Sequence, residues 1–181
     1  LPAPTIGAVG LIKNPDQLIT KQARDGHVAI LIGKTEGHLG RSALLQTVFN
    51  RDEGDAPSVD LDTEKRTGDF IRQNCTLIKA CRDLSDGGLA LVAFEMAHEG
   101  GVGIQLTSDD TEFLFGEDQA RYLVACNFDQ AEALMVAAFE AGITISSVGR
   151  FTGNDVKFGK SQAPLTELSH IFTSQFGKTF N

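Results

Sequence analysis

A polar turn that ends in two glycines and runs into an apolar helix lies at residues 83–90 (DLSDGGLA). Paired glycines let a ligand or another segment approach the backbone closely, because neither residue carries a Cβ atom. The first amides of the following helix lack partners within the helix and carry the positive end of its dipole. The segment therefore predicts either a site for a phosphate or carbonyl oxygen, or a plain helix N-cap made by Asp86.

Hydrophobic periodicity on both sides of this turn predicts a mixture of strands and helices. We expect strands at residues 6–12, 27–33, 102–106, 122–126, 144–148 and 156–158. We expect helices at residues 42–49, 61–80, 88–98, 129–141 and 165–176. The continuous apolar run of 27–33 is typical of a strand in a sheet that is covered on both faces.

Local turn signals refine three of these elements. Asp129 and Glu132 have the spacing of a capping box, and Gly142 is a typical helix C-cap. Gly153 and Asn154 predict the turn of a closing hairpin between the last two strands.

The order of elements favours the α+β class, with a mixed β-sheet packed against helices. The helix, two strands, helix, strand order of 88–148 resembles part of a ferredoxin-like layout. No internal repeat is visible, so we expect residues 1–181 to form a single domain.

Composition excludes several classes of function. Lys and Arg number 16 against 24 Asp and Glu, and the net charge of −8 disfavours sequence-independent binding of nucleic acid. No apolar run approaches the roughly 20 residues of a membrane helix. The chain starts without Met or a leader, so we expect a fragment of a longer, cytoplasmic polypeptide.

The cysteines and histidines do not predict a metal site. Three cysteines, Cys75, Cys81 and Cys126, lack the spacing of zinc ligands and cannot all form disulfides within the chain. The four histidines are scattered as well. We expect reduced, structural thiols and no metal ligands in this chain.

A loop that contains several glycines lies at residues 33–42 (GKTEGHLGRS), between a predicted strand and a predicted helix. It lacks the Gly-Lys-Ser/Thr ending of a Walker nucleotide loop. Gly40, Arg41 and Ser42 could form an anion cradle with nearby amides, and the alternative is a solvated connection.

An acidic turn lies at residues 114–124 (LFGEDQARYLV) and leads into an apolar strand. Glu117 and Arg121 could pair with each other there. The alternative to a functional role is a structural salt bridge, which stabilises little when it is exposed.

Five segments together carry a family resemblance: residues 4–11 (PTIGAVGL), the loop through Ser42, and the sequences SDGGLA, LFGE and VGR at 85–90, 114–117 and 148–150. In this order the chain resembles the last domain of the large synthetase subunit of the phosphoribosylformylglycinamidine synthases, over nearly its whole length. Related synthetases and kinases usually have different glycine turns, and aminoimidazole ribonucleotide synthetase is the alternative enzyme.

The resemblance implies a ligase of de novo purine biosynthesis. Such enzymes use ATP, with magnesium, and glutamine-derived ammonia to convert formylglycinamide ribonucleotide to formylglycinamidine ribonucleotide. The implied partners are the N-type domains of the same subunit, a glutaminase subunit, a small accessory subunit and the phosphorylated ribonucleotide substrate. A domain that is purely structural or serves only for interaction is the alternative from another class.

The resemblance also places candidate ligand-binding or phosphate-binding residues on the three segments, and it identifies no catalytic residue. They are Gly40, Arg41, Ser42, Asp83, Ser85, Asp86, Gly87, Gly88, Glu117 and Arg121. Two positions depart from the family pattern, which commonly has Gly at 41 and His at 82. Arg41 and Arg82 add cations, and neither can act as the general base that a His could be.

Overall fold

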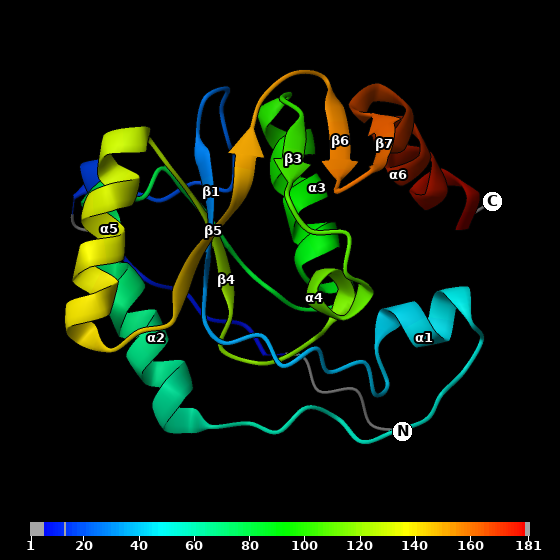
Figure 1. Cartoon of the computed structure of the whole chain (residues 1–181), viewed down its shortest axis with the longest axis horizontal. Coiled ribbons are helices and arrows are strands. Elements are labelled where there is room, and N and C mark those ends of the chain that lie inside the picture. Colours follow the sequence, from blue (N-terminus) through cyan, green and yellow to red (C-terminus); the bar gives the residue numbers. More distant parts are fainter. Residues whose placement is uncertain (1–5, 13, 180–181) are drawn as a thin grey trace.

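The computed structural model describes residues 6–12 and 14–179. Its centre is a seven-stranded mixed sheet with the order β2-β4-β1-β5-β3-β6-β7 (Figure 1). The strands are β1 (Val28–Ile32), β2 (Ala80–Asp83), β3 (Ile104–Leu106), β4 (Tyr122–Cys126), β5 (Ile145–Phe151), β6 (Asp155–Phe158) and β7 (Ser161–Pro164). The helices are α1 (Ala43–Val48), α2 (Leu61–Gln73), α3 (Gly88–Gly100), α4 (Thr111–Phe115), α5 (Phe128–Ala141) and α6 (Leu165–Thr179), with short 3-10 turns η1 (Pro15–Gln17) and η2 (Cys75–Leu77). The predicted α+β class is confirmed.

Strand β1 is an interior strand of the sheet and is buried on both faces, as its apolar run predicts. It pairs antiparallel with β4 on one side and with β5 on the other. Alternate side chains enter different cores: Leu31 packs in the core of α3, whereas Ile30 packs in the core of α2 and α5. This alternation follows from the two-residue period of a strand.

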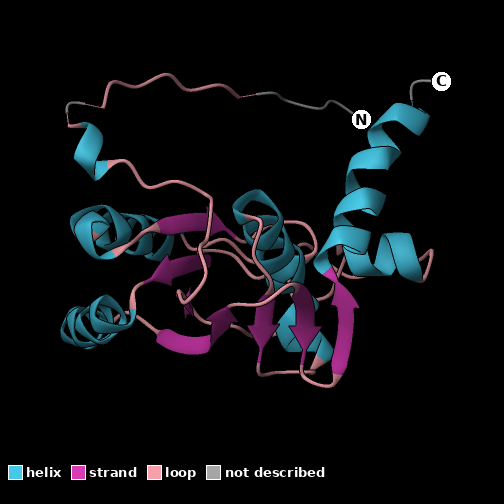
Figure 2. Cartoon of the chain, turned by 90° about the horizontal axis from the view of Figure 1, so that it is seen from above, coloured by secondary structure: helices cyan, strands magenta, loops and turns pink. Residues whose placement is uncertain are grey.

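The two faces of the sheet have different helical covers. On one face, α3 contributes Leu89 and Met96, and α4 and α6 add Leu114 and Leu165. On the other face, α2 contributes Phe70 and Ile71, and α5 contributes Leu134 with Ala131 and Ala138. In Figure 2 the far end of α6 projects away from the sheet.

Three predicted elements differ in the structure. Residues 6–12 form no strand, and Ile6 and Val9 are almost fully exposed. The predicted helix at 61–80 ends early, because the backbone and side chain of Asn74 both donate to the Phe70 carbonyl, after which the chain turns into β2. The Asp129–Glu132 capping box is also wrong, since Asn127 holds the N-cap position of α5. Gly142 does end α5, with a φ of 64°.

The predicted hairpin of β5 and β6 is also wrong. Gly103 donates to the Gly153 carbonyl at 2.7 Å and accepts from Thr152 at 2.9 Å, which fixes the turn beside the start of β3. Strand β6 therefore pairs in parallel with β3 and antiparallel with β7. The predicted helix, two strands, helix, strand order of 88–148 occurs as α3, β3, β4, α5 and β5, with the short helix α4 between the two strands, and β1 lies between β4 and β5 in the sheet.

His27, next to β1, provides a pH-dependent contribution to stability. Burial, reinforced by Arg24 and Lys79, lowers the pKa of His27 from its ordinary value of 6.5. Its Nδ1 accepts from the Arg24 amide at 3.2 Å, which requires an unprotonated nitrogen. Protonation therefore favours the unfolded chain, and stability should decrease as the pH falls through 6.5 toward the lower pKa of the folded state.

We expect His27→Asn to remove this part of the pH dependence, since the Asn side-chain oxygen can accept from the same amide. Urea unfolding from about pH 8 to about pH 5 measures the difference between wild type and variant. A constant difference across this range would show that His27 does not titrate on unfolding.

None of the described helices is both long and apolar enough to span a membrane.

Candidate functional site

The loop at residues 33–42, which we call the first glycine loop, connects β1 to α1 and ends in a fully buried N-cap. Ser42 has extended backbone angles, and its Oγ accepts from the Leu45 amide at 3.3 Å. Its exposed fraction is 0%. Ser42 therefore stabilises the start of α1, and its hydroxyl is already engaged within the helix.

The glycine turn, residues 83–88, connects β2 to α3 in a way that requires glycine. Gly87, not Asp86, is the N-cap of α3, with a φ of 77°. A Cβ atom on Gly88 would lie 2.5 Å from the Gly116 carbonyl oxygen, so the start of α3 packs directly on the end of α4. Ser85 and Asp86 are exposed on the turn.

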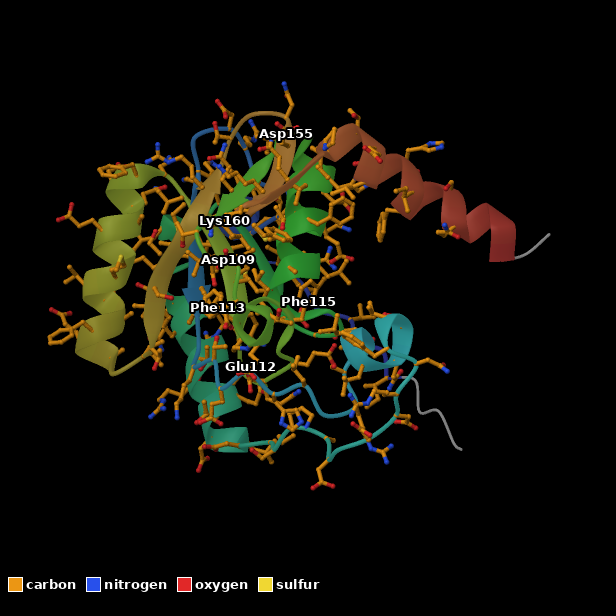
Figure 3. All side chains as sticks on the ribbon, turned by 45° about the vertical axis from the view of Figure 1, so that its right-hand side comes forward. Asp109, Glu112, Phe113, Phe115, Asp155 and Lys160 are labelled. Carbon is orange, nitrogen blue, oxygen red and sulfur yellow. The ribbon has the colours of Figure 1, made fainter. Side chains whose placement is uncertain are left out.

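Helix α4 packs against the first glycine loop as well. A Cβ atom on Gly37 would lie 2.8 Å from the Cβ of Glu112. Figure 3 shows Glu112, Phe113 and Phe115 grouped on this short helix. The two glycine segments thus meet on one support, which is α4 and the turn that follows it.

Glu117, in that following turn, joins the two segments through a single atom. Its Oε1 accepts from the Ala43 amide at 2.8 Å and from the Gly87 amide at 2.8 Å. These amides belong to the starts of α1 and α3, where donors lack partners within the helix. The carboxylate thereby holds the two predicted ligand segments together.

Asp118, which was not among the residues selected from the sequence, fixes the rest of the first glycine loop. Its two carboxylate oxygens accept from the amides of Glu36, Gly37 and His38 at 3.0 to 3.2 Å. The only sequence signal was its place next to Glu117 in an acidic turn. We call Glu117 and Asp118 the acidic pair.

Arg121 lies under the acidic pair, with 1% of its surface exposed. It donates to the carbonyls of Asp118 and Gly116 and, at 3.1 Å, to the Thr35 hydroxyl. Its ion pair is with Asp118 at 3.7 Å and not with Glu117. Burial lowers the pKa of the Arg121 guanidinium, and the negative charges of Asp118 and Glu117 oppose that shift.

The two arginines that depart from the family pattern both have acidic partners in this structure. Arg41 has a φ of 55°, which explains why glycine suits this position. Its Nε donates to the Gly54 carbonyl at 3.1 Å, and its guanidinium lies 3.6 Å from Asp52. Arg82 pairs with Glu95 of α3 at 2.7 Å.

A shallow hollow of about 290 Å³ adjoins the first glycine loop on the side of Asp118. Its lining includes Lys34, His38 and Asp60, and His38 Nε2 lies 2.8 Å from the Asp55 carbonyl. Gly40 lies close to the same Asp55 backbone, because a Cβ atom added to Gly40 would lie 2.5 Å from the Asp55 carbonyl oxygen.

Asp83, the remaining candidate residue, is exposed at the end of β2, on the glycine turn.

Two of the three thiols are unreactive, and the described residues hold no cluster of potential metal ligands. In residues 6–12 and 14–179, no three His, Cys, Asp or Glu side chains come together as metal ligands would. Burial raises the pKa of the Cys81 and Cys126 thiols to about 12, which keeps both protonated at neutral pH.

Comparisons with known proteins agree on a family. Residues 24–160 match the family described as AIR synthase related protein, C-terminal domain. The chain is 65% identical over 98% of its length to phosphoribosylformylglycinamidine synthase subunit PurL of Roseobacter denitrificans, covering 25% of that protein, and 63% identical over 98% to that of Ruegeria sp., again covering 25%. The chain thus spans about a quarter of these relatives.

A solved structure has the same fold at low sequence identity. PurL of Thermotoga maritima, solved in complex with FGAR, superposes with a TM-score of 0.72 at 19% identity over 86% of this chain and 30% of that one. The same T. maritima protein has been solved with ADP and with ATP, and also as PurLQS. The match of residues 24–160 to this family, together with the shared fold, leads to one conclusion: this chain belongs to the family of AIR synthase related proteins, as a C-terminal domain of that family.

Proposed function

We propose that this chain is the C-terminal domain of a phosphoribosylformylglycinamidine synthase and lines a ligand cleft of the complete synthetase subunit. One structural observation carries the proposal: the first glycine loop and the glycine turn converge at Glu117, each beginning a helix. The 65% identity to a subunit of this name supports the assignment of the activity.

The proposed reaction forms an amidine in purine biosynthesis. ATP activates the formylglycinamide oxygen as a phosphate ester, and ammonia from glutamine then displaces the phosphate. The exposed part of the glycine turn, Ser85 and Asp86, is suited to contact the ribonucleotide, because neither side chain is buried in the fold. Ser42 and the acidic pair act from beneath by fixing the backbone of both segments.

Two backbone donors and one cation that could serve an anionic ligand already have partners within the chain. The inward amides of Ala43 and Gly87 are already bonded to Glu117, and Arg41 is tied to Asp52 and Gly54. A phosphate therefore needs further cations from outside this chain. We propose that the N-type domains of the same subunit supply them, together with most of the ATP contacts.

Magnesium is assigned to those domains as well. In the part of this chain that the structure describes, no group of metal-ligating side chains fits the ion. The accompanying proposal for partners is a glutaminase subunit and a small accessory subunit in the cytoplasm, for which the solved PurLQS of T. maritima is the supporting parallel.

The test uses the complete subunit with ATP, formylglycinamide ribonucleotide and ammonium salt. We expect ammonia-dependent formation of the amidine by the complete subunit and none by the 181-residue chain alone. Asp86→Ala should reduce kcat/KM of the complete subunit at least about tenfold, the equivalent of roughly 1.4 kcal/mol, without changing its melting temperature.

Asp25→Ala is the matched control, since Asp25 is another exposed Asp but precedes β1, at the opposite end of that strand from the first glycine loop. Equal activity of the wild type and both variants would show that the glycine turn serves only as a structural connection. Amidine formation by the isolated chain would refute the need for other domains.

A further inference from the structure

We infer that the exposed apolar side of α5 is a docking surface for another domain of the same longer polypeptide. The surface, which we call the α5 patch, consists of Phe128, Met135, Val136 and Phe139. The inference rests on the proposed function only in assuming that a longer polypeptide surrounds this chain. It concerns a place remote from the glycine segments.

The α5 patch is an apolar stripe along one helix, interrupted by Glu132 between Phe128 and Met135. Phe128, Met135 and Phe139 are spaced by seven and four residues, which brings them to one side of an α-helix. Their exposed fractions are 72%, 38% and 86%. The buried side of the same helix, Ala131, Leu134 and Ala138, is already packed in the core, so the patch is a second apolar side.

The patch borders an open hollow between α5 and the sheet. The hollow has a volume of about 550 Å³, and Val28 and Ser147 form its floor on the strand side. Figure 1 shows α5 at one edge of the molecule. An apolar side chain from a neighbour could therefore enter between Phe128 and Phe139.

Charge argues against a second copy of the same surface as the occupant. Helix α5 carries Asp129, Glu132 and Glu140 and no Lys or Arg. Glu132 lines the hollow itself. Two α5 patches facing each other would bring like charges together, which disfavours association. The fitting partner presents apolar side chains bordered by Lys or Arg.

The size of the patch favours an occupant that is covalently connected. Two exposed Phe side chains with Met135 and Val136 offer on the order of 450 Å², against roughly 800 Å² per partner in a stable complex of separate proteins. A tethered domain needs less area, because a linker raises its effective concentration to the millimolar range. Relatives of this chain contain about three times as much additional polypeptide to supply it, since the chain spans 25% of them.

The principal experiment places the photoreactive amino acid benzoylphenylalanine at position 139 of the complete subunit. Irradiation should produce a cross-link within one polypeptide, and peptide mass spectrometry should locate its second end outside these 181 residues. A cross-link to a second copy, to a different subunit, only to residues of this chain, or to nothing would overturn the inference.

A substitution gives an independent measurement. Phe139→Asp should lower the melting temperature of the complete subunit by about 5 °C, because it places a charge in an apolar contact. Ala133→Asp is the matched control, since Ala133 is exposed on the same helix, about 120° around its axis from Phe139, and should change the melting temperature less. Equal shifts for the two variants would also contradict docking at the patch.

The outcome is separable from that of the proposed function. Cross-linking requires no turnover, so an internal cross-link in a subunit without synthase activity would retain the docking surface and reject the activity. An active subunit without the cross-link would retain the proposed activity and reject the docking surface.

Discussion

Glu117→Ala should destabilise the folded chain by about 3 kcal/mol, since it removes the common acceptor of two amides at helix starts and each unpaired donor costs roughly 1 to 3 kcal/mol. The amides of Ala43 and Gly87 both depend on this one oxygen. The free energy of unfolding in urea measures the loss. Hydrogen exchange should show faster exchange at the same two amides.

Glu117→Gln is the control that separates hydrogen bonding from charge. The Gln side-chain oxygen can accept from both amides, but without a negative charge, so we expect a loss of only about 1 kcal/mol. If Gln and Ala were equally destabilising, the charge would matter and not the bonds. If neither had an effect, the two segments would be held by α4 alone.

Gly88→Ala should cost about 4 kcal/mol of stability, the sum of two effects. Its φ of 60° is costly for any residue with a Cβ, by roughly 1 to 2 kcal/mol. The added Cβ would also lie 2.5 Å from the Gly116 carbonyl oxygen, and such overpacking costs a further 1 to 3 kcal/mol, roughly. Urea unfolding measures the total.

Gly101→Ala isolates the first effect. Gly101 has a φ of 64°, but a Cβ atom added there would meet no other atom within 4 Å, so its substitution should cost only the roughly 1 to 2 kcal/mol of the backbone conformation. Equal losses for the two variants would show that α4 moves aside without cost and that the contact at Gly88 is loose.

The sequence was sufficient for elements whose signals are local. The apolar run of β1, the helix of α3 and the C-cap at Gly142 depend on residues close together in the chain, and the structure confirms all three. The class of the fold followed from their order. The hairpin prediction failed because the turn at 152–154 is held by Gly103, which lies far away in the sequence.

The sequence singled out the segments of the candidate site but not the contacts that their residues make. The glycine turn and the first glycine loop meet at Glu117, whereas Asp86 does not cap α3 and the ion pair of Arg121 is with Asp118. Asp118 was missed because its contacts are to backbone amides, which carry no sequence signature. Such contacts depend on where the chain returns in space.

The position of β1 between two strands that come much later in the chain determines when the sheet can be completed during synthesis. Val28 pairs with Cys126 on one side and Arg150 on the other, so its neighbours leave the ribosome much later. At 5 to 20 residues per second, roughly ten seconds pass before β5 has been made. Until β4 has been made, the apolar strand β1 has no native partner, and a chaperone or earlier parts of the polypeptide could cover it.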